Sequence, residues 1–512
     1  MLVKVFGSAV YGITATTITV EVTVAQGIKF FLVGLPDSAV KESQQRIESA
    51  LSYNGFRMPG KKIVVNMAPA DIRKEGSAYD LAIAIGIMAA SGQIPETRLG
   101  DFIIMGELSL DGGLLPIRGA LLIAVQAKQE GFKGLILPLE NAREAAIVEG
   151  IQIYGAEKII DIIHFLSGEE TLSPTIIDSE KDFNIPDSFS EVDFTDVKGQ
   201  ENIKRALEIA AAGGHNVILI GPPGAGKTML AKRLPSILPP FSLNEALETT
   251  KIHSVAGKMT KHSSLLLQRP FRSPHHTISD VALVGGGQNP QPGEISLAHN
   301  GVLFMDELPE FKRTVLEVMR QPLEDRVVTI SRARFTVEYP ASFMLVASMN
   351  PCPCGFYNHP EKDCVCPPGT VQKYLNRISG PLLDRIDLHV EVTPVKFDEL
   401  TATRTSERSA DIRQRVIDAR EIQRIRFEKV RGVYCNAQMN SRMLRTWCKI
   451  DEAGNQLLKT AMEMLSLSAR AYDRILKVAR TIADLENAER IGIAHLSEAI
   501  QLRSLDRDNW AG

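Results

Sequence analysis

The sequence has few cysteines, no long apolar stretch and almost no net charge, and each absence excludes a class of protein. Six cysteines among 512 residues are too few for a disulfide scaffold, so we expect a reducing compartment, the cytoplasm. The longest apolar runs, such as Val217–Ile220, fall far short of the roughly 20 residues that a membrane helix needs, and no secretory signal follows Met1. We therefore expect no membrane partner. A net charge of −3 means that any binding of nucleic acid requires a local basic patch.

The length predicts several domains. At roughly 100–200 residues per domain, two to four are expected, and 44% apolar with 23% charged residues is typical of a globular chain. The patterns predict a mixed α and β domain over 1–168, a linker over 169–195 that is rich in Ser, Asp and Pro, a core over 196–394 and a helical domain over 395–512.

Short apolar runs define the expected strands. In the first domain, alternation predicts strands at Ile13–Val24 and Lys61–Met67 on either side of a helix at Ser38–Asn54. In the core, unbroken apolar runs suit central strands of a parallel sheet covered on both faces. These runs are Asn216–Ile220, Gly301–Met305 and Phe343–Ala347. The expected fold class is therefore α/β.

A glycine-rich loop follows the first of these core strands and precedes a helical pattern at Met229–Leu234. The loop consists of Gly221, Pro222, Pro223, Gly224, Ala225, Gly226, Lys227 and Thr228. Glycines allow backbone N–H groups to turn inward around phosphates. Lys227 is expected to reach the β- and γ-phosphates of ATP, and the Thr228 hydroxyl to bind Mg²⁺.

The other two core strands end in polar residues. Asp306 and Glu307 follow an apolar strand, and they suit a carboxylate near Mg²⁺ and a base that polarises the attacking water. Asn350 follows the third strand, where it would orient that water. An acidic pair alone is usually a solvated strand end, and an Asn before a Pro is usually a turn residue. Here both follow apolar strands that come after the glycine-rich loop, and this order favours a role in ATP hydrolysis.

This series resembles the AAA+ ATPases, with Walker A, Walker B and sensor 1 motifs. Asp196–Gln200 resembles the segment that such proteins place near adenine. Leu382–Asp387 resembles the motif that supplies an arginine finger in the magnesium chelatase and MCM clade. The resemblance implies that Arg385 acts on the γ-phosphate bound by a neighbouring subunit. Such an arrangement requires a ring of subunits, most often a homo-hexamer. Ser468–Arg474 resembles sensor 2, and we favour Arg470 over Arg474 for that role. Surface ion pairs are the alternative for these arginines.

Between the second and third core strands, Arg326–Tyr339 reads as two alternating strands around a polar tip. It resembles the pre-sensor-1 hairpin of the same clade, which in ring helicases points into the pore. Arg332 and Arg334 would then bind DNA phosphates, and an exposed hairpin with two solvated arginines is the alternative.

Upstream, the Gly- and Pro-rich stretch Phe271–Gly293 resembles the helix-2 insert. We expect its adjacent His275 and His276 to be exposed, with metal binding as the alternative.

Four cysteines lie within fifteen residues directly after Asn350. They are Cys352, Cys354, Cys364 and Cys366. Two thiolate pairs joined by a short loop match the four-sulfur shell of structural zinc, so we expect Zn²⁺ here. His359 could replace one cysteine as a ligand, and free thiols are the alternative.

Charge is concentrated in one place. Thr401–Ile450 has ten Arg and two Lys against two Asp and three Glu, a net charge of +7. Such a segment predicts a phosphate-binding face or, alternatively, a helix that packs on an acidic neighbour.

The first domain carries a second resemblance. Arg73–Ala82 followed by Gly106–Ile117 resembles the proteolytic domain of Lon. The catalytic serine of that motif aligns with Ala78, one place after Ser77, and Arg118–Ala124 lacks the lysine that would act as base. We therefore expect a non-proteolytic relative. A similar domain in the recombination protein RadA contacts DNA.

The order of these parts resembles the ComM (YifB) family over nearly the whole chain. The resemblance implies a hexameric ATP-driven DNA helicase for branch migration in homologous recombination, notably in natural transformation. It also implies single-stranded and branched DNA, and recombination proteins, as partners. A chelatase-type motor that remodels a protein, and an ATP-dependent protease, are the alternatives.

Overall fold

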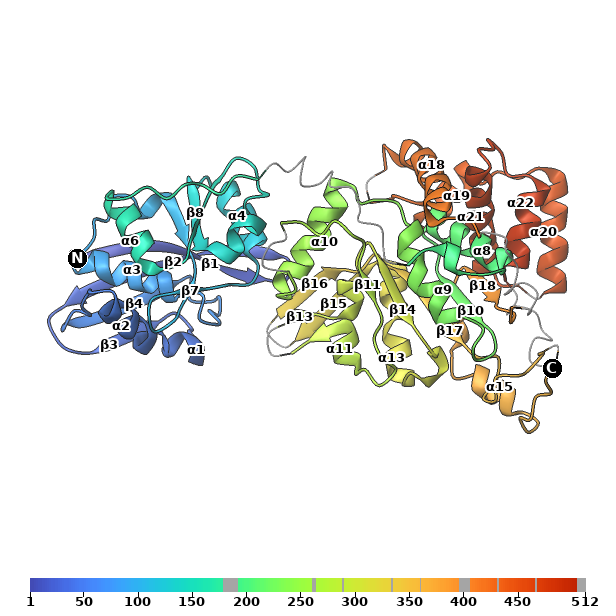
Figure 1. The fold of residues 1–512 in the computed structure, drawn as a ribbon, viewed down its shortest axis with the longest axis horizontal. Coiled ribbons are helices and arrows are strands. Elements are labelled where there is room, and N and C mark those ends of the chain that lie inside the picture. Colours follow the sequence, from blue (N-terminus) through green and yellow to red (C-terminus); the bar gives the residue numbers. More distant parts are fainter. Residues whose placement is uncertain are drawn as a thin grey trace. The chain divides into compact units, whose positions relative to one another are not determined.

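The computed structural model describes residues 1–177, 192–259, 264–287, 290–332, 335–359, 361–395, 406–430, 432–465 and 467–503. They form two compact units. The first contains the described residues within Met1–Pro186, Ser242–Leu267 and Ala333–Tyr339, and the second contains the others. Each unit combines a sheet with helices (Figure 1), so the expected α/β class is confirmed. Most of the expected linker lies outside the described residues.

The first unit is built on a mixed seven-stranded sheet. Its order is β3-β4-β2-β1-β5-β8-β9, antiparallel around β2 and parallel from β1 to β9. The strands are β1 (Leu2–Tyr11), β2 (Thr14–Ala25), β3 (Phe30–Val33), β4 (Lys62–Ala68), β5 (Phe102–Ile104), β8 (Gly134–Pro138) and β9 (Gln152–Ala156). A separate small ribbon pairs β6 (Glu107–Leu108) with β7 (Leu114–Leu115). Alternate residues of β2 are buried, so both strands expected in this domain are confirmed as β2 and β4.

Helices cover this sheet. They are α1 (Ser38–Lys41), α2 (Ser43–Tyr53), α3 (Asp80–Ala90), α4 (Ala120–Gln129), α5 (Leu139–Ala145), α6 (Ile159–Ser167) and α10 (Leu243–Val255). The single helix expected over 38–54 is broken at Glu42 into α1 and α2. Every residue of α3 is buried. Asp80 at its start accepts two hydrogen bonds from the Arg46 guanidinium on α2, of 2.6 and 2.9 Å, which joins the two helices.

Helix α10 returns to the first unit from the middle of the chain. Val255 packs against Ala15 of β2 and Leu122 of α4. The neighbouring Ser254 hydroxyl donates to the buried Glu144 carboxylate, which also accepts the Leu121 N–H at 3.0 Å. These contacts assign α10 to the first unit, although in sequence it lies inside the expected core.

The second unit is built on a five-stranded parallel sheet of order β11-β14-β17-β10-β18. The strands are β10 (Val217–Ile220), β11 (Phe271–Arg272), β14 (Val302–Met305), β17 (Met344–Met349) and β18 (Leu388–Glu391). The three central strands are buried throughout, which explains their unbroken apolar sequences and confirms the expected core strands. The edge strand β11 was not expected, because two residues carry no periodic signal.

Helices around this sheet and beyond it complete the second unit (Figure 1). They are α8 (Glu201–Gly213), α9 (Lys227–Arg233), α11 (Asp280–Val284), α12 (Glu294–Leu297), α13 (Arg313–Val318), α14 (Arg320–Asp325), α15 (Thr370–Leu375), α16 (Gly380–Leu383), α18 (Ser409–Phe427), α19 (Ser441–Trp447), α20 (Glu452–Met464), α21 (Ala469–Leu485) and α22 (Ile493–Gln501). The part after residue 405 is helical, as expected. Its helices α18 and α21 pack on α8, where the Gln423 side chain donates to the Ala212 carbonyl at 3.1 Å.

Two short ribbons lie between the core strands along the chain. They pair β12 (Gly285–Gly286) with β13 (Gln291–Pro292) and β15 (Val327–Arg332) with β16 (Phe335–Pro340). The second ribbon is the expected hairpin. No helix among the described residues is long and apolar enough to cross a lipid bilayer.

The close approach of α3 to β1 and β2 gives a test of the first unit. A Cβ on Gly86 would lie 2.6 Å from Val22 Cγ2 and 3.4 Å from Val5 Cγ2. We expect Gly86→Ala to destabilise the fold by about 1–3 kcal/mol, because overpacking outweighs the better helix propensity of alanine. Thermal or urea unfolding measures this. In a Val22→Ala background the same change should cost less, and an equal cost in both backgrounds would contradict the packing argument.

Candidate functional site

The glycine-rich loop connects β10 to α9, as the sequence predicts. Gly224 and Gly226 have φ of +79° and +89°, a region that favours glycine, and a Cβ on Gly224 would meet no atom within 4 Å. At the start of the loop a Cβ on Gly221 would lie 2.3 Å from the Val392 carbonyl oxygen. The glycines therefore allow the turn, keep one side of the loop open and permit close packing on the chain after β18.

The Lys227 ammonium is held at this loop. Its Nζ donates to the carbonyls of Gly221 at 2.7 Å and Pro222 at 2.9 Å, and to Asn350 Oδ1 at 3.1 Å. Burial lowers the pKa of Lys227, while the charges of Asp306 and Glu307 act in the opposite direction. The ammonium thus has only neutral acceptors, which the charged oxygens of a phosphate would readily replace.

Asp306 lies directly after β14 and faces the same loop. The Thr228 hydroxyl donates to Asp306 Oδ2 at 2.8 Å, and the Ser348 hydroxyl donates to Oδ1. A hydroxyl beside a carboxylate is the oxygen ligand set that Mg²⁺ prefers in phosphate sites. The donors therefore fit Mg²⁺ between Thr228 and Asp306.

Glu307 has a strained backbone. Its φ is +54°, which is uncommon outside glycine, and its N–H donates to Ser348 Oγ at 3.3 Å. The Glu307 carboxylate is more than half exposed and lies 3.7 Å from Nδ1 of His276. An exposed carboxylate next to the metal-binding pair suits a base that acts on water, and this role stays a prediction.

Sequence reasoning missed the contacts that three residues make at this site. Ser348 links Asp306 and Glu307 from β17, and His276 lies beside Glu307, whereas we expected an exposed histidine pair with metal binding as the alternative. Gln200, which has φ of +58°, donates from its side chain to the carbonyls of Ala225 at 3.0 Å and Thr393 at 3.1 Å. Its place in the segment expected near adenine was the only signal.

The predicted finger and sensor 2 arginines lie apart from the phosphate loop. Arg385, Arg470 and Arg474 line a cavity of about 390 Å³ to which, among the described residues, no part of the phosphate loop contributes. Arg385 is 8% exposed, its Nη1 donates to the Pro381 carbonyl at 2.7 Å and its Nη2 pairs with Glu324.

The two candidates for sensor 2 differ in their surroundings. Arg470 is more than half exposed and lies 4.0 Å from Asp384. Arg474 pairs with the buried Asp387, and although burial raises the pKa of Asp387, Arg474 and His215 lower it far below its usual range. Arg474 is thus committed to an internal ion pair, and Arg470 remains our preferred candidate.

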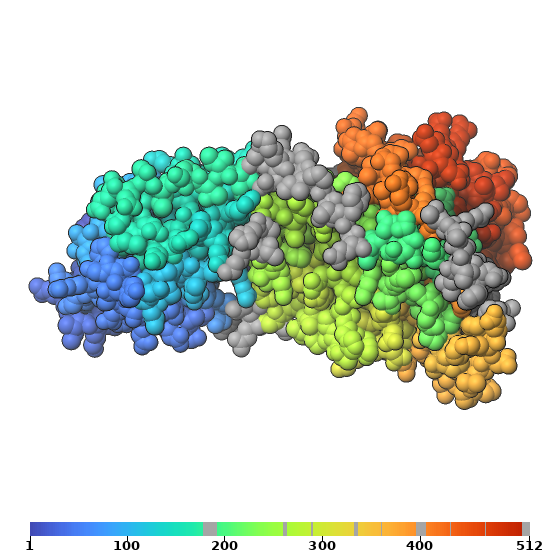
Figure 2. All heavy atoms as spheres, in the orientation of Figure 1, coloured from blue at the N-terminus to red at the C-terminus, as the bar shows by residue number. Residues whose placement is uncertain are grey.

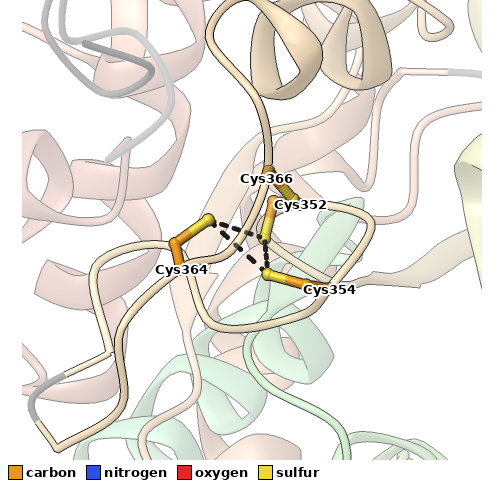
Figure 3. A group of neighbouring side chains, drawn as sticks. All are labelled: Cys352, Cys354, Cys364 and Cys366. Atoms are coloured by element: carbon orange, nitrogen blue, oxygen red, sulfur yellow. Dashed lines mark hydrogen bonds between the residues drawn. The ribbon is translucent and has the colours of Figure 1, made fainter.

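The four clustered cysteines meet in space. Figure 3 shows their side chains converging from the two ends of one loop, and their sulfur atoms all lie within 4.8 Å of one another. Three of the sulfur–sulfur distances are 3.2, 3.5 and 3.7 Å. A tetrahedron with Zn–S bonds of ~2.3 Å has edges of about 3.8 Å, so the cluster could hold such a metal ion. His359 accepts hydrogen bonds from the N–H groups of Glu361 and Lys362 and is not in the cluster.

The cysteine loop packs beside the nucleotide site. A Cβ on Gly355, whose φ is +85°, would lie 2.5 Å from Pro223 Cδ in the phosphate loop. The described residues around α15 form a lobe on the surface of the second unit (Figure 2, gold). The cysteine loop begins directly after Asn350, so the cysteines lie next to the nucleotide site along the chain.

The predicted DNA contacts are only partly described. Arg332 ends β15, but its side chain and the whole of Arg334 lie outside the described residues.

Four arginines of the basic segment around α18 form ion pairs within the protein. Arg415 pairs with Glu208 and Glu407, Arg426 with Asp484, Arg424 with Glu421 on the same helix, and Arg408, directly before α18, with Asp411 in its first turn. This favours the alternative of a helix packed on acidic neighbours over a free phosphate-binding face.

The Lon-like segment has the local structure of a helix start. Ser77 lies before α3, the Ala78 carbonyl accepts the Gly106 N–H at 2.8 Å, and within the described residues the Ser77 hydroxyl has no hydrogen-bond partner. No base is therefore positioned at this serine in the part of the chain that the structure describes.

Comparison with known proteins agrees with this arrangement. The family model described as magnesium chelatase, subunit ChlI, matches residues 193–400, and related models of that subunit match residues 20–141 and 406–503. The chain is 46% identical to competence protein ComM of Haemophilus influenzae over 510 residues, 99% of this chain and 98% of that protein.

The uncharacterized protein YifB of Escherichia coli is 44% identical over 98% of this chain and 96% of its own length. The chain belongs to the ComM/YifB family. It is also 32% identical over 159 residues to Lon protease 2 of Bacillus subtilis, 28% of this chain and 27% of that protein. A magnesium-chelatase-like AAA+ protein with a Lon-like part, as the sequence suggested, implies ATP and Mg²⁺ as ligands.

Proposed function

We propose that the protein is an ATP-driven DNA motor that assembles as a cytoplasmic homo-hexameric ring and promotes branch migration in homologous recombination, particularly during natural transformation. The observation that supports ATPase activity is that the residues following strands β10, β14 and β17 lie close together. Thr228, Asp306 and Asn350 come from different parts of the chain, yet hydrogen bonds of 2.8 and 3.1 Å join them through the phosphate loop.

The roles follow from this geometry. Backbone N–H groups of Gly221–Thr228 and the Lys227 ammonium would bind the phosphates, and Thr228 and Asp306 would hold Mg²⁺, which neutralises phosphate charge. Glu307 would accept the proton of the attacking water, and Asn350 would orient that water. The cavity that Arg385 lines lies away from these groups, which supports action on the nucleotide of a neighbouring subunit.

DNA as the substrate has two supports. The relative in Haemophilus influenzae is named a competence protein, which suggests handling of DNA that has been taken up. Arg332 is the last residue of β15 and Arg334 precedes β16 in the sequence, and cationic side chains between two hairpin strands bind phosphates without selecting sequence. The basic α18 segment, in which four arginines form ion pairs within the protein, adds no support.

A Glu307→Gln variant separates binding from hydrolysis. It should bind ATP with unchanged affinity but hydrolyse it at least about a hundredfold more slowly, because removal of a general base typically costs 10²–10⁴ in rate. Fluorescent-nucleotide titration and phosphate release measure the two steps. Glu310→Gln, which removes an exposed carboxylate paired with Arg377, is the matched control. Normal turnover of Glu307→Gln would remove this residue as the base.

Stimulation by DNA tests the substrate. Single-stranded and branched DNA should raise the rate of ATP hydrolysis, and Arg332→Ala/Arg334→Ala should abolish that stimulation while preserving the basal rate. The control pair Arg408→Ala/Arg424→Ala removes arginines that are paired with nearby acidic residues and should keep it. Because phosphate contacts release counterions, the stimulation should fall steeply with salt.

Displacement of a strand from a three- or four-stranded junction tests branch migration directly. If no DNA changes the rate at which the wild-type protein hydrolyses ATP, the alternative is favoured, namely a chelatase-type motor that remodels a protein.

The cysteine cluster is proposed to hold one structural zinc ion. Four thiolates fill a tetrahedral shell, so the ion would stabilise the loop between Asn350 and α15 without binding substrate. Metal analysis should find about one zinc per chain, and Cys354→Ser/Cys364→Ser should lose it, with Cys435→Ala as the control outside the cluster. Less than about half an equivalent in the wild-type protein would contradict the assignment.

A further inference from the structure

The cavity lined by Arg385 contains more positive charge than the family motifs account for. We call it the cation cavity. Its basic residues are Arg326, Arg385, Arg470, Arg474 and Lys477. Its acidic residues are Glu324, Asp387 and Asp473. With five cations against three carboxylates, the lining carries a net positive charge.

Two of the carboxylates are already occupied. Oδ1 of Asp387 accepts from Arg474, and its Oδ2 accepts the backbone N–H of Asn216 at 2.9 Å. Glu324 accepts from Arg385. Neither carboxylate is therefore available to neutralise Arg326 and Lys477, and within the described residues the third, Asp473, forms no ion pair with either cation.

Arg326 and Lys477 share one weak acceptor. The Lys477 ammonium donates to the Ala437 carbonyl at 3.1 Å, and Nη2 of Arg326 approaches the same oxygen at 3.4 Å. Within the described residues neither cation forms an ion pair. Burial lowers the pKa of both side chains, and the charge of Arg474 lowers it further, while Asp387 opposes this effect for both and Asp473 opposes it for Lys477. Two desolvated cations that converge on one neutral oxygen favour the binding of an anion.

The backbone at Arg326 supports a fixed position for this side chain. Arg326 directly follows α14 with φ of +60°, where glycine or asparagine would be less strained. Its Nη1 makes only a 3.4 Å contact to the Ser342 hydroxyl. The fold thus holds a guanidinium toward the cavity without supplying it with a strong acceptor.

We propose that Lys477 and Arg326 bind the terminal phosphate of a nucleotide held in the phosphate loop of a neighbouring protomer. This inference rests on the proposed ring and adds two phosphate-binding residues that no motif assigns. A phosphate supplies several charged oxygens, enough for both cations, and Arg385 and Arg470 line the same cavity. Among the described residues, no part of the chain's own phosphate loop lines this cavity, which favours a neighbour's nucleotide over its own.

Mixed rings test this arrangement. Lys477→Gln and Arg326→Gln should each retain nucleotide binding at the phosphate loop but lose at least about tenfold in ATP turnover, since one charge-assisted contact is removed. Glu307→Gln retains an intact cation cavity. Mixed in equal amounts with Lys477→Gln, it should restore turnover to about a quarter of the wild-type rate, because that share of interfaces pairs a competent loop with an intact cavity. Lys459→Gln, an exposed lysine on α20, is the control.

Folding is monitored independently of turnover. Thermal unfolding and fluorescent-nucleotide binding identify a variant that has merely lost its structure, and Lys477→Arg keeps the charge, so it should retain most turnover. A structural role for Lys477 predicts instead that Lys477→Arg fails like Lys477→Gln. That result would overturn the inference.

The other outcomes separate this inference from the proposed function. If Arg385→Ala mixed with Glu307→Gln recovers turnover but Lys477→Gln with Glu307→Gln does not, the ring stands and the new residues are wrong. If wild-type protein does not hydrolyse ATP, or if no mixture recovers, the proposed function fails as well. If Lys477→Gln loses DNA binding while turnover is normal, the phosphate belongs to DNA and the nucleotide assignment is overturned.

Discussion

The parallel alignment of β10, β17 and β14 is the constraint on which the nucleotide site depends. Ile220 lies opposite Met349 and Met305 opposite Ala347, so the three strands end at the same edge of the sheet. The next residues along each strand are then neighbours, which is why Thr228 reaches Asp306 and Lys227 reaches Asn350. A slip of one residue in either pairing would turn Asp306 or Asn350 to the other face of the sheet.

This edge is organised before any ligand binds. Hydrogen bonds from Thr228 and Ser348 satisfy Asp306, while Lys227 is satisfied by two backbone carbonyls and Asn350. Each partner is neutral, so replacing it with a phosphate or a divalent cation strengthens the electrostatic interaction without first breaking an ion pair. The cysteine loop extends this organisation, because it begins directly after Asn350 and packs through Gly355 on the phosphate loop.

Much of this site could be predicted from sequence, because its signals are local. An apolar strand followed by a glycine-rich loop or by acidic residues lies within about ten residues of chain. Ser348, Gln200 and the β11 edge strand were not predictable, because their roles depend on partners far away in sequence. The same holds for α10, which packs with Ala15 and Leu122 although it lies more than a hundred residues beyond either.

The arginines show why charge alone is a poor guide to function. In the segment with the highest positive charge, around α18, four arginines already form ion pairs, two of them with Glu208 and Asp484 outside the segment and the others with acidic residues inside it. Arg326 and Lys477 do not stand out in a count of charges along the sequence, yet neither has a carboxylate partner among the described residues. Because the cost of an unpaired charge rises as water is excluded, what distinguishes a binding site is an uncompensated cation in a cavity. That reasoning separates the cation cavity from the basic helix, and it requires the tertiary contacts that sequence does not provide.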